Sequence, residues 1–381
     1  MTSSPSVYPK VVISGTGLWT PPHVVTNEEL VTAYNSWANR YNTIHAKAIS
    51  AGEMTAKPEG SAAFIEKAAG IKQRYVYAKE GLLDIDRMRP ILSERPESAL
   101  SDQAEVGADA GRKAMEAAGK TADDIDAVIV SCSYTQRAYP AIAIEVQDAL
   151  GIQNGFAFDM LVGCSAGTFA LHRAYEMVRS GTARTVLVVN PEMISPQANY
   201  CDRDSHFIFG DAATALVVER EETFTSAHGF EILSAHAQTR FSSNVRSNFG
   251  YFSRITDADP FSATNLFHQN GRRVFKEVCP MAIQHLSAHI GQYGLAASDI
   301  RRWWLHQANS HMNEMICTKL LGHPASFDEA PIILDQYANT ASAGSLIVFH
   351  LYHDDLQSGD HGVICSFGAG YSIGSLILKK R

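Results

Sequence analysis

The sequence predicts an α/β protein built from two similar halves. Two stretches repeat one order of helix, short loop, buried strand and polar turn: AEVGADAGRKAMEAAGKTADDIDAVIVSCSYTQ and VCPMAIQHLSAHIGQYGLAASDIRRWWLHQANS. The halves also end alike, because RTVLVVN followed by GDAATALVVER is similar to GVICSFG followed by YSIGSLILKK. A repeat of this length indicates duplication of one α/β unit and not a short-period solenoid.

The individual elements follow from the spacing of apolar residues. Helices are predicted where these residues lie three and four positions apart, and strands where they form runs such as AVIVSC. A boundary after ALVVER gives an N-terminal half, 1–221, and a C-terminal half, 222–381. Residues 33–60 form a mostly helical insertion, and the polar segment 236–270 is predicted as surface loops or a short extra hairpin. Such insertions either shape a substrate entrance or are plain surface excursions.

Composition restricts the class of protein. The chain has 381 residues, of which 45% are hydrophobic and 19% charged, as is typical of globular proteins. No apolar run reaches the roughly 18 residues of a membrane span, and a signal-peptide pattern is absent. Six scattered cysteines without a CxxC pair indicate reduced thiols and a cytoplasmic location. The net charge of −8 disfavours nucleic acid as the main partner.

Cys164 lies between a predicted strand, GFAFDMLV, and a predicted helix, SAGTFALHRAYEMVRSG. At a helix start, unpaired N–H groups and the helix dipole lower the pKa of a thiol. The turn is analogous to the nucleophile elbow of hydrolases, with cysteine in place of serine. Cysteine is also a common small core residue, so this turn alone leaves nucleophile and packing residue equally open.

The second half offers partners for a nucleophile. His306 ends the strand that corresponds to DAVIVSC, where α/β proteins gather active-site groups, although a lone histidine is more often structural. Asn339 lies in the turn YANTASAGS, where asparagine usually serves the local backbone. The turn SFGAGYSIGS offers N–H groups to an oxyanion, or merely joins two strands. The joint appearance of these signals favours an active site.

VGCSAG around Cys164, LHQAN around His306, YANTASAGS around Asn339 and the terminal SFGAGYSIGS together resemble the β-ketoacyl-acyl-carrier-protein synthase III family of the thiolase superfamily. The match covers nearly the whole chain apart from the two insertions. DRDSHFIFGD and FGAGYSIGSLILKKR are most similar to the β-ketodecanoyl branch of the family. The resemblance implies a thiolase fold, five-layered αβαβα and built from two duplicated halves, usually as a homodimer.

The resemblance also implies a ping-pong condensation in fatty-acid synthesis. Cys164 would take an acyl group from an acyl-CoA, a medium-chain one of about eight carbons in this branch, and the enolate of malonyl-acyl carrier protein would then extend it by two carbons. His306 and Asn339 would stabilise the enolate, while the N–H groups of Cys164 and Ala369 form the oxyanion hole. CoA and carrier-protein thioesters are the expected substrates, with no cofactor and no metal.

Further contacts carry over from the family. Phe209 and Phe367 match aromatic residues of the active-site tunnel, and Arg203 matches an arginine near the CoA nucleotide. The positions that match the family's pantetheine channel are Ala308, Asn309, Gly271 and Phe275. Tyr139 falls where the dimer partner closes the acyl pocket, and Phe64 falls at the adenine site.

Two departures from the family concern the entrance. A tryptophan and an arginine that commonly hold adenine are Phe64 and Ala68 here, so a ring remains but the charge is absent. The basic residue that often follows HQAN is His311. A substitute docking patch for an acidic carrier is predicted from five cations, each of which alone reads as solvated surface charge: Arg272, Arg273, Lys276, Arg301 and Arg302.

Alternative functions remain open at this point. One is a condensing enzyme of a secondary pathway, such as polyketide or quinolone assembly. A second is a non-catalytic, acyl-binding subunit of the thiolase fold, and a third is a thioesterase in which water reaches the acyl-cysteine. The pair His285 and His289 has the spacing of zinc ligands but lacks the glutamate of HExxH, so no metal site is predicted.

Overall fold

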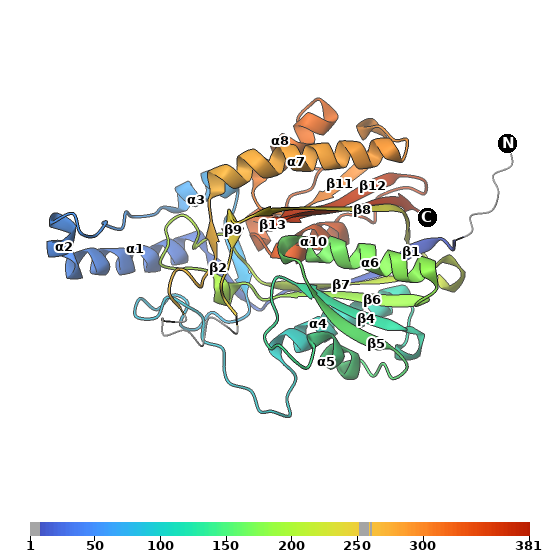
Figure 1. Ribbon diagram of the computed structural model, residues 1–381, viewed down its shortest axis with the longest axis horizontal. Helices are drawn as coiled ribbons and strands as arrows, with labels where there is room; N and C mark the ends of the chain where they lie inside the picture. Colours follow the sequence, from blue (N-terminus) through green and yellow to red (C-terminus); the bar gives the residue numbers. More distant parts are fainter. Residues whose placement is uncertain (1–7, 251–258, 260) are drawn as a thin grey trace.

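The computed structural model describes residues 8–250, 259 and 261–381, and these form five layers, αβαβα (Figure 1). The first outer layer consists of α7 (Gly271–Gln292) and α8 (Ser310–Leu321), and below it lie the strands β11 (Ile300–Leu305), β12 (His361–Gly368), β13 (Gly370–Lys380) and β8 (Phe230–Ser242). The middle layer consists of α6 (Ala166–Ser180) and α10 (Gly344–Leu351). The second set of strands follows, with β1 (Val11–Trp19), β7 (Ala212–Arg220), β6 (Thr185–Glu192), β4 (Ala127–Cys132) and β5 (Phe156–Leu161), and the other outer layer consists of α4 (Asp102–Ala118) and α5 (Ile142–Ala149).

Strand pairing repeats between the two halves. In the described residues one sheet has the order β11-β12-β13-β8-β1-β7-β6-β4-β5. The parallel pair β4–β6 followed by antiparallel β7 and β1 corresponds to the parallel pair β11–β12 followed by antiparallel β13 and β8. This equivalence is the one that the sequence repeat predicts. Residue 221 lies in the connection between β7 and β8, where the two series meet.

The middle layer brings two turns together. Helices α6 and α10 pack between the two sets of strands, and the turns that precede them, Gly163–Ser165 and Ala341–Ala343, touch each other. Small residues make this approach possible. A Cβ on Gly167 would lie 2.8 Å from the carbonyl oxygen of Ser342, so only glycine fits there. In the part of the chain that the structure describes, no helix is long and apolar enough to cross a membrane.

The 33–60 insertion forms an arm that projects from the layered body (Figure 1). Its helices are α1 (Asn27–Ile44) and α2 (Ala46–Ser50), so the first begins before residue 33, where Thr26 and Glu29 make a capping box. The returning chain bonds back to α1, since Asn42 Nδ2 donates to the carbonyl of Lys57 at 2.9 Å. The return leads to α3 (Ala62–Ala69), β3 (Gln73–Val76) and its partner β2 (His23–Thr26).

The segment 236–270 differs in part from the prediction. Its first seven residues are not a loop but the end of β8, because β13 is long enough to continue pairing as far as Ser242. Farther on, β9 (Val245–Arg246) pairs with β10 (His268–Gln269), which corresponds to the short extra hairpin. Residues 251–258 and 260 lie outside the described residues. A last short helix, α9 (Leu334–Tyr337), precedes the Asn339 turn.

Helix α7 turns two histidines toward the sheet. His285 Nε2 and His289 Nδ1 lie 2.8 and 2.7 Å from the Oγ of Ser375. Burial, with His236 as the next cause, lowers the pKa of His285 to about 3 and that of His289 to about 4. His172 also lowers the pKa of His289. The pair therefore serves as neutral hydrogen-bonding groups, and no cluster of metal-ligand type occurs among the described residues.

Acid is expected to destabilise the protein through this pair. Because the folded-state pKa lies below the unfolded value, the stabilisation is complete above about pH 6.5 and is lost as the pH falls toward about 4. His289→Gln removes one titrating ring and should flatten the pH dependence of the free energy of unfolding over this range. Urea unfolding at several pH values measures it, with the exposed His23→Gln as the control. Equal slopes for the two variants would contradict the prediction.

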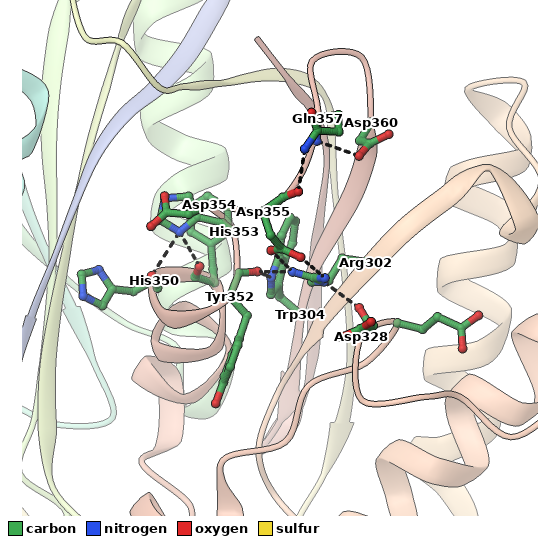
Figure 2. A network of polar contacts seen from close by, with 12 residues as sticks. Arg302, Trp304, Asp328, His350, Tyr352, His353, Asp354, Asp355, Gln357 and Asp360 are labelled. Carbon is green, nitrogen blue, oxygen red and sulfur yellow. Dashed lines mark hydrogen bonds and ion pairs between the residues drawn. The ribbon is translucent and has the colours of Figure 1, made fainter.

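Arg302 on β11 is buried in a polar network and is not part of a docking patch (Figure 2). Its side chain is 3% exposed, and Nη1 and Nη2 donate to the carboxylate of Asp355 at 2.5 and 2.8 Å. Nε donates to the carbonyl of Asp328 at 2.6 Å, and Nη1 also donates to that of Tyr352 at 3.1 Å. Successive strand residues face opposite sides, so Arg301 is exposed where Arg302 points inward. The prediction was wrong for Arg302.

Asp355→Asn should lower the free energy of unfolding by about 1–2 kcal/mol, because a buried guanidinium loses its carboxylate while solvent screens the loss. The hydrogen bond from Arg302 lowers the pKa of Asp355 from 3.8. This stabilisation is therefore present above the unfolded-state pKa and is lost as the pH falls through the folded-state value. Urea unfolding at neutral and acidic pH measures it. The exposed pair Lys72–Glu66 supplies a control, Glu66→Gln, which should be near neutral.

Candidate active site

Cys164 occupies a tight turn between β5 and α6. Gly163 before it has φ +56°, a left-handed conformation that favours glycine. The backbone N–H groups of Ala369 and of Cys164 itself lie close enough to the sulfur to lower the pKa of the thiol in part. Gly368 leaves the room that this requires, because a Cβ there would lie 2.5 Å from the Cβ of Cys164 and 3.1 Å from its Sγ. The turn thus presents the sulfur atom to two amides at once.

The thiol is more weakly acidic than its helix-start position predicts. Burial, followed by the negative charge of Glu192, raises the pKa of Cys164 to about 12, although the two amides lower it in part. The expected lowering was wrong because residues from the second half of the chain surround the sulfur and remove water from it, and this outweighs the effect of the helix start. At neutral pH the thiol is therefore protonated, and attack on a thioester requires a group that accepts its proton.

His306 lies at the end of β11 with 1% of its surface exposed. Its ring packs edge-on against Phe367, with ring centroids 5.3 Å apart. Burial lowers the pKa of His306 to about 4, and the backbone of Ala341 raises it in part. The imidazole is therefore neutral at pH 7 and can accept a proton or donate one. Nδ1 has no hydrogen-bond partner among the described residues. The backbone carbonyl of Ala341 lies near the ring and favours an N–H on it.

Asn339 has one side of its amide committed and the other available. Its Oδ1 accepts the N–H of Ala341 at 2.9 Å, which leaves Nδ2 as a donor. Its backbone is held by Ile208 and Gly210 at 3.0 and 3.1 Å. Ala338 and Ala341 have φ +55° and +47°, which alanine rarely adopts, and such backbone strain gathers at functional sites.

One cavity of about 450 Å³ brings the predicted catalytic residues together. Cys164, His306 and Asn339 all line it. The carried-over positions that line it as well are Ala369, Phe209, Phe367, Gly271, Phe275, Ala308, Asn309 and Phe64. Tyr139 is not among the lining residues and is 85% exposed, as a residue that reaches a second subunit would be. Its predicted role stays a prediction.

A second cavity of about 260 Å³ meets the first at Cys164. Both are lined by Phe209, Val245, Phe267, Ala369 and the cysteine itself. The far wall of the second cavity includes Tyr134 and Phe249, whose rings pack edge-on with centroids 6.1 Å apart. Sequence reasoning missed Val245, Phe249 and Phe267 because they lie in a segment that is polar on average.

The entrance of the larger cavity is tied to the arm. The guanidinium of Arg203 lies 4.1 Å above the ring of Phe64, and its Nε donates to the carbonyl of Glu59 at 2.9 Å. One face of the Phe64 ring, the predicted stacking partner of adenine, is therefore covered by the Arg203 cation. Asn309 uses both sides of its amide within the protein, since Nδ2 donates to the carbonyl of Ala68 and Oδ1 caps α8.

Four of the five cations that were predicted to form a docking patch are exposed: Arg301 on β11, and three on the first turns of α7. Arg272, Arg273 and Lys276 are exposed there, and Arg272 lines the mouth of the larger cavity. None of the three forms an ion pair with a described residue. Sequence reasoning also missed Glu192, which ends β6 and is 0% exposed. The signal for it was a carboxylate at the end of a buried strand in VLVVNPE.

Comparisons with known proteins agree with this arrangement. Models of 3-oxoacyl-[acyl-carrier-protein] synthase III and of its C-terminal part match residues 158–240 and 290–380. The chain is 51% identical to the β-ketodecanoyl-[acyl-carrier-protein] synthase of Pseudomonas aeruginosa, over 92% of this chain and 99% of that protein. It is 30% identical to the β-ketoacyl-[acyl-carrier-protein] synthase III of Allorhizobium ampelinum, over 87% and 94% of the two chains.

Solved structures agree on the fold. The 3-oxoacyl-[acyl-carrier-protein] synthase III of Aquifex aeolicus superposes with a TM-score of 0.74 at 21% identity, over 97% of this chain and 99% of that one. The priming β-ketosynthase of the R1128 polyketide pathway superposes with a TM-score of 0.76 at 22% identity, over 100% and 98%. The chain therefore belongs to the β-ketoacyl-acyl-carrier-protein synthase III family of acyltransferases, in the branch that includes the β-ketodecanoyl synthase.

Proposed function

We propose that this protein condenses a medium-chain acyl-CoA, preferably octanoyl-CoA, with malonyl-acyl carrier protein through an acyl-Cys164 thioester. The observation that carries the proposal is the position of Cys164 where two cavities meet. The larger cavity, which opens beside Phe64 and Arg272, would hold the pantetheine arm of the CoA or carrier thioester. The smaller one would hold the acyl chain.

The size of the smaller cavity supports a medium-chain donor. At roughly 30 Å³ per heavy atom in a condensed phase, its 260 Å³ takes about nine heavy atoms. That number is close to the size of an octanoyl group, which has nine heavy atoms. The name of the Pseudomonas aeruginosa relative specifies a ten-carbon β-keto product, which a two-carbon extension makes from an octanoyl donor.

In the first half-reaction Cys164 Sγ attacks the thioester carbonyl, and neutral His306 accepts the thiol proton. The tetrahedral oxyanion accepts hydrogen bonds from the N–H groups of Cys164 and Ala369, which already converge on the sulfur. The C–S bond to CoA then breaks, and the departing CoA thiolate takes up a proton from His306. The acyl-enzyme and free CoA are the products.

In the second half-reaction malonyl-carrier protein enters the same channel. Its carboxylate leaves as CO₂, and the electron pair of that C–C bond forms an enolate. His306, in the tautomer that carries its N–H on the nitrogen facing the cavity, and Nδ2 of Asn339 donate to the enolate oxygen, which preorganised donors stabilise by a few kcal/mol each. The enolate carbon attacks the acyl carbonyl, and the Cys164 thiolate leaves and takes up a proton from water. The exposed cations Arg272, Arg273 and Lys276 lie where an acidic carrier would dock.

We also infer a homodimer. In the described residues β5 is a terminal strand of the sheet, so one of its edges is unpaired. Phe156 and Leu161 on it are 45% and 56% exposed, and Tyr139 nearby in sequence is 85% exposed. An unpaired strand with exposed apolar residues is suited to pairing with a second copy.

The proposed function is tested by incubating the protein with malonyl-carrier protein and acyl-CoAs of two, eight and twelve carbons. Mass spectrometry of the carrier should show a β-ketodecanoyl group made from octanoyl-CoA at the highest rate. Free fatty acid formed without malonyl-carrier protein would indicate a thioesterase. Acyl binding without any product would indicate a non-catalytic subunit, and turnover only with a dedicated secondary-pathway carrier would indicate that pathway.

A further inference from the structure

A buried carboxylate lies directly behind the candidate active site. Glu192 is 0% exposed and accepts hydrogen bonds from two serines. The N–H and Oγ of Ser342 donate to it at 3.1 and 2.5 Å, and those of Ser133 at 3.1 and 3.2 Å. Burial raises the pKa of Glu192 to about 7 despite these four donors. No described residue forms an ion pair with it, so its charge is balanced by hydrogen bonds alone.

The two serines lie on segments that have to meet for the site to form. Ser342 follows Ala341, whose N–H fixes the amide of Asn339 and whose carbonyl side faces His306. Ser133 directly follows β4 in the first half of the chain. Glu192 therefore fastens the Asn339–Ser342 turn to the half that carries Cys164. The hydrogen bonds from Ser342 to Glu192 lie next to Ala341, whose positive φ is strained and has to be held by the surrounding structure.

Its charge also acts on the sulfur. After burial, the negative charge of Glu192 is the next cause that raises the pKa of Cys164. A charge with this effect inside a buried site is felt more strongly than one at the surface, because little water screens it. Replacing the carboxylate with a neutral group of the same shape should thus make the thiol ionise at lower pH.

We propose that Glu192 is a positioning residue of the condensation site: its hydrogen bonds with Ser342 and Ser133 hold the Asn339 turn at its working position relative to Cys164. Catalytic donors must be held to within about 0.5 Å of their working geometry, and a misplacement of about 1 Å can lower a rate a hundredfold. The role in decarboxylation rests on the proposed function, whereas the effect on the thiol does not.

Asp211 offers a matched control for a purely structural buried carboxylate. It is 0% exposed and accepts hydrogen bonds from the Oγ of Ser195 at 2.6 Å and from backbone N–H groups of Ile194, Ser195 and Tyr77 at 2.7–2.9 Å. Burial raises its pKa as well. Unlike Glu192, it is not among the charges that act on the Cys164 thiol.

The first experiment compares Glu192→Gln and Asp211→Asn with the unaltered protein in the pH dependence of alkylation by iodoacetamide, read at Cys164 by peptide mass spectrometry. The Glu192→Gln profile should shift to lower pH, so that Cys164 reacts several-fold faster at neutral pH. The Asp211→Asn profile should coincide with that of the unaltered protein. A Glu192→Gln profile that does not move, or equal shifts in both variants, would overturn the inferred effect of the Glu192 charge on the pKa of Cys164.

The second experiment measures release of CO₂ from malonyl-carrier protein beside formation of the acyl-enzyme. In Glu192→Gln the side-chain NH₂ group, itself a donor, faces the N–H and hydroxyl donors of Ser342 and Ser133, so these hydrogen bonds are weakened. We therefore expect decarboxylation to fall by at least about tenfold while acyl transfer persists. Ser342→Ala removes only the Oγ bond; it should lower decarboxylation, and it serves if Glu192→Gln does not fold. Unchanged decarboxylation in both would overturn positioning. If the unaltered protein releases no CO₂, the proposed function fails, and alkylation still decides the effect of Glu192 on the thiol.

Discussion

Replacing Cys164 with alanine is expected to lower condensation by about 10³-fold or more, because no acyl thioester can form. Serine should not restore it. Its hydroxyl fits the turn and can accept the same two amide hydrogen bonds, but it ionises at far higher pH than a thiol, which burial at this position already makes weakly acidic. The measurement is β-ketoacyl-carrier product formed from octanoyl-CoA and malonyl-carrier protein.

Cys201→Ser is the control for loss of a thiol elsewhere. Cys201 is partly buried and lines neither of the cavities that meet at Cys164. It should retain nearly full activity. Product formed at comparable rates by the Cys164→Ala protein would show that the reaction does not proceed through this side chain.

The second large effect is expected at Asn339. Asn339→Asp keeps the oxygen that accepts the Ala341 N–H and removes the Nδ2 donor, so the turn should persist while one enolate donor is lost. Removing one such donor lowers rates by about 10²–10³-fold, and we expect this loss in decarboxylation of malonyl-carrier protein. Acyl transfer from octanoyl-CoA to Cys164 should change much less, because its oxyanion is held by backbone amides.

Measuring the two half-reactions separately distinguishes a donor from a structural residue. Asn339→Ala should resemble Asn339→Asp in decarboxylation and in addition lose some stability, since the Ala341 N–H then lacks its acceptor. Equal losses in both half-reactions for Asn339→Asp would indicate a general distortion of the site. No loss in decarboxylation would exclude Asn339 as an enolate donor.

The layered fold could be predicted because its signals are local and repeated. Strand runs such as AVIVSC and RTVLVVN recur in both halves, and the small residues after Cys164 indicate a helix that is packed on both sides. Strand ends were less predictable, because β8 continues to Ser242 only where β13 supplies a partner. The face of Arg302 was also hidden, since IRRWWL does not alternate clearly between polar and apolar residues.

The convergence of Cys164, His306 and Asn339 could be predicted because VGCSAG, LHQAN and YANTASAGS together resemble the motifs of one family. The pKa of the thiol could not, because it depends on burial by elements distant in sequence. Glu192 carries no motif of its own, and its role depends on a serine 150 positions farther along the chain. The division at residue 221, the dimer and the contacts of Tyr139 stay predictions.

The most direct test of the central claim is intact-protein mass spectrometry after incubation with acyl-CoAs from two to twelve carbons, with Cys164→Ala in parallel. The account predicts one acyl adduct per chain, most abundant with octanoyl-CoA and absent from Cys164→Ala. An adduct that persists in Cys164→Ala, or the absence of any adduct with every donor, would contradict an acyl-Cys164 intermediate. Adducts with acetyl-CoA alone would contradict the assignment of the smaller cavity to a medium chain.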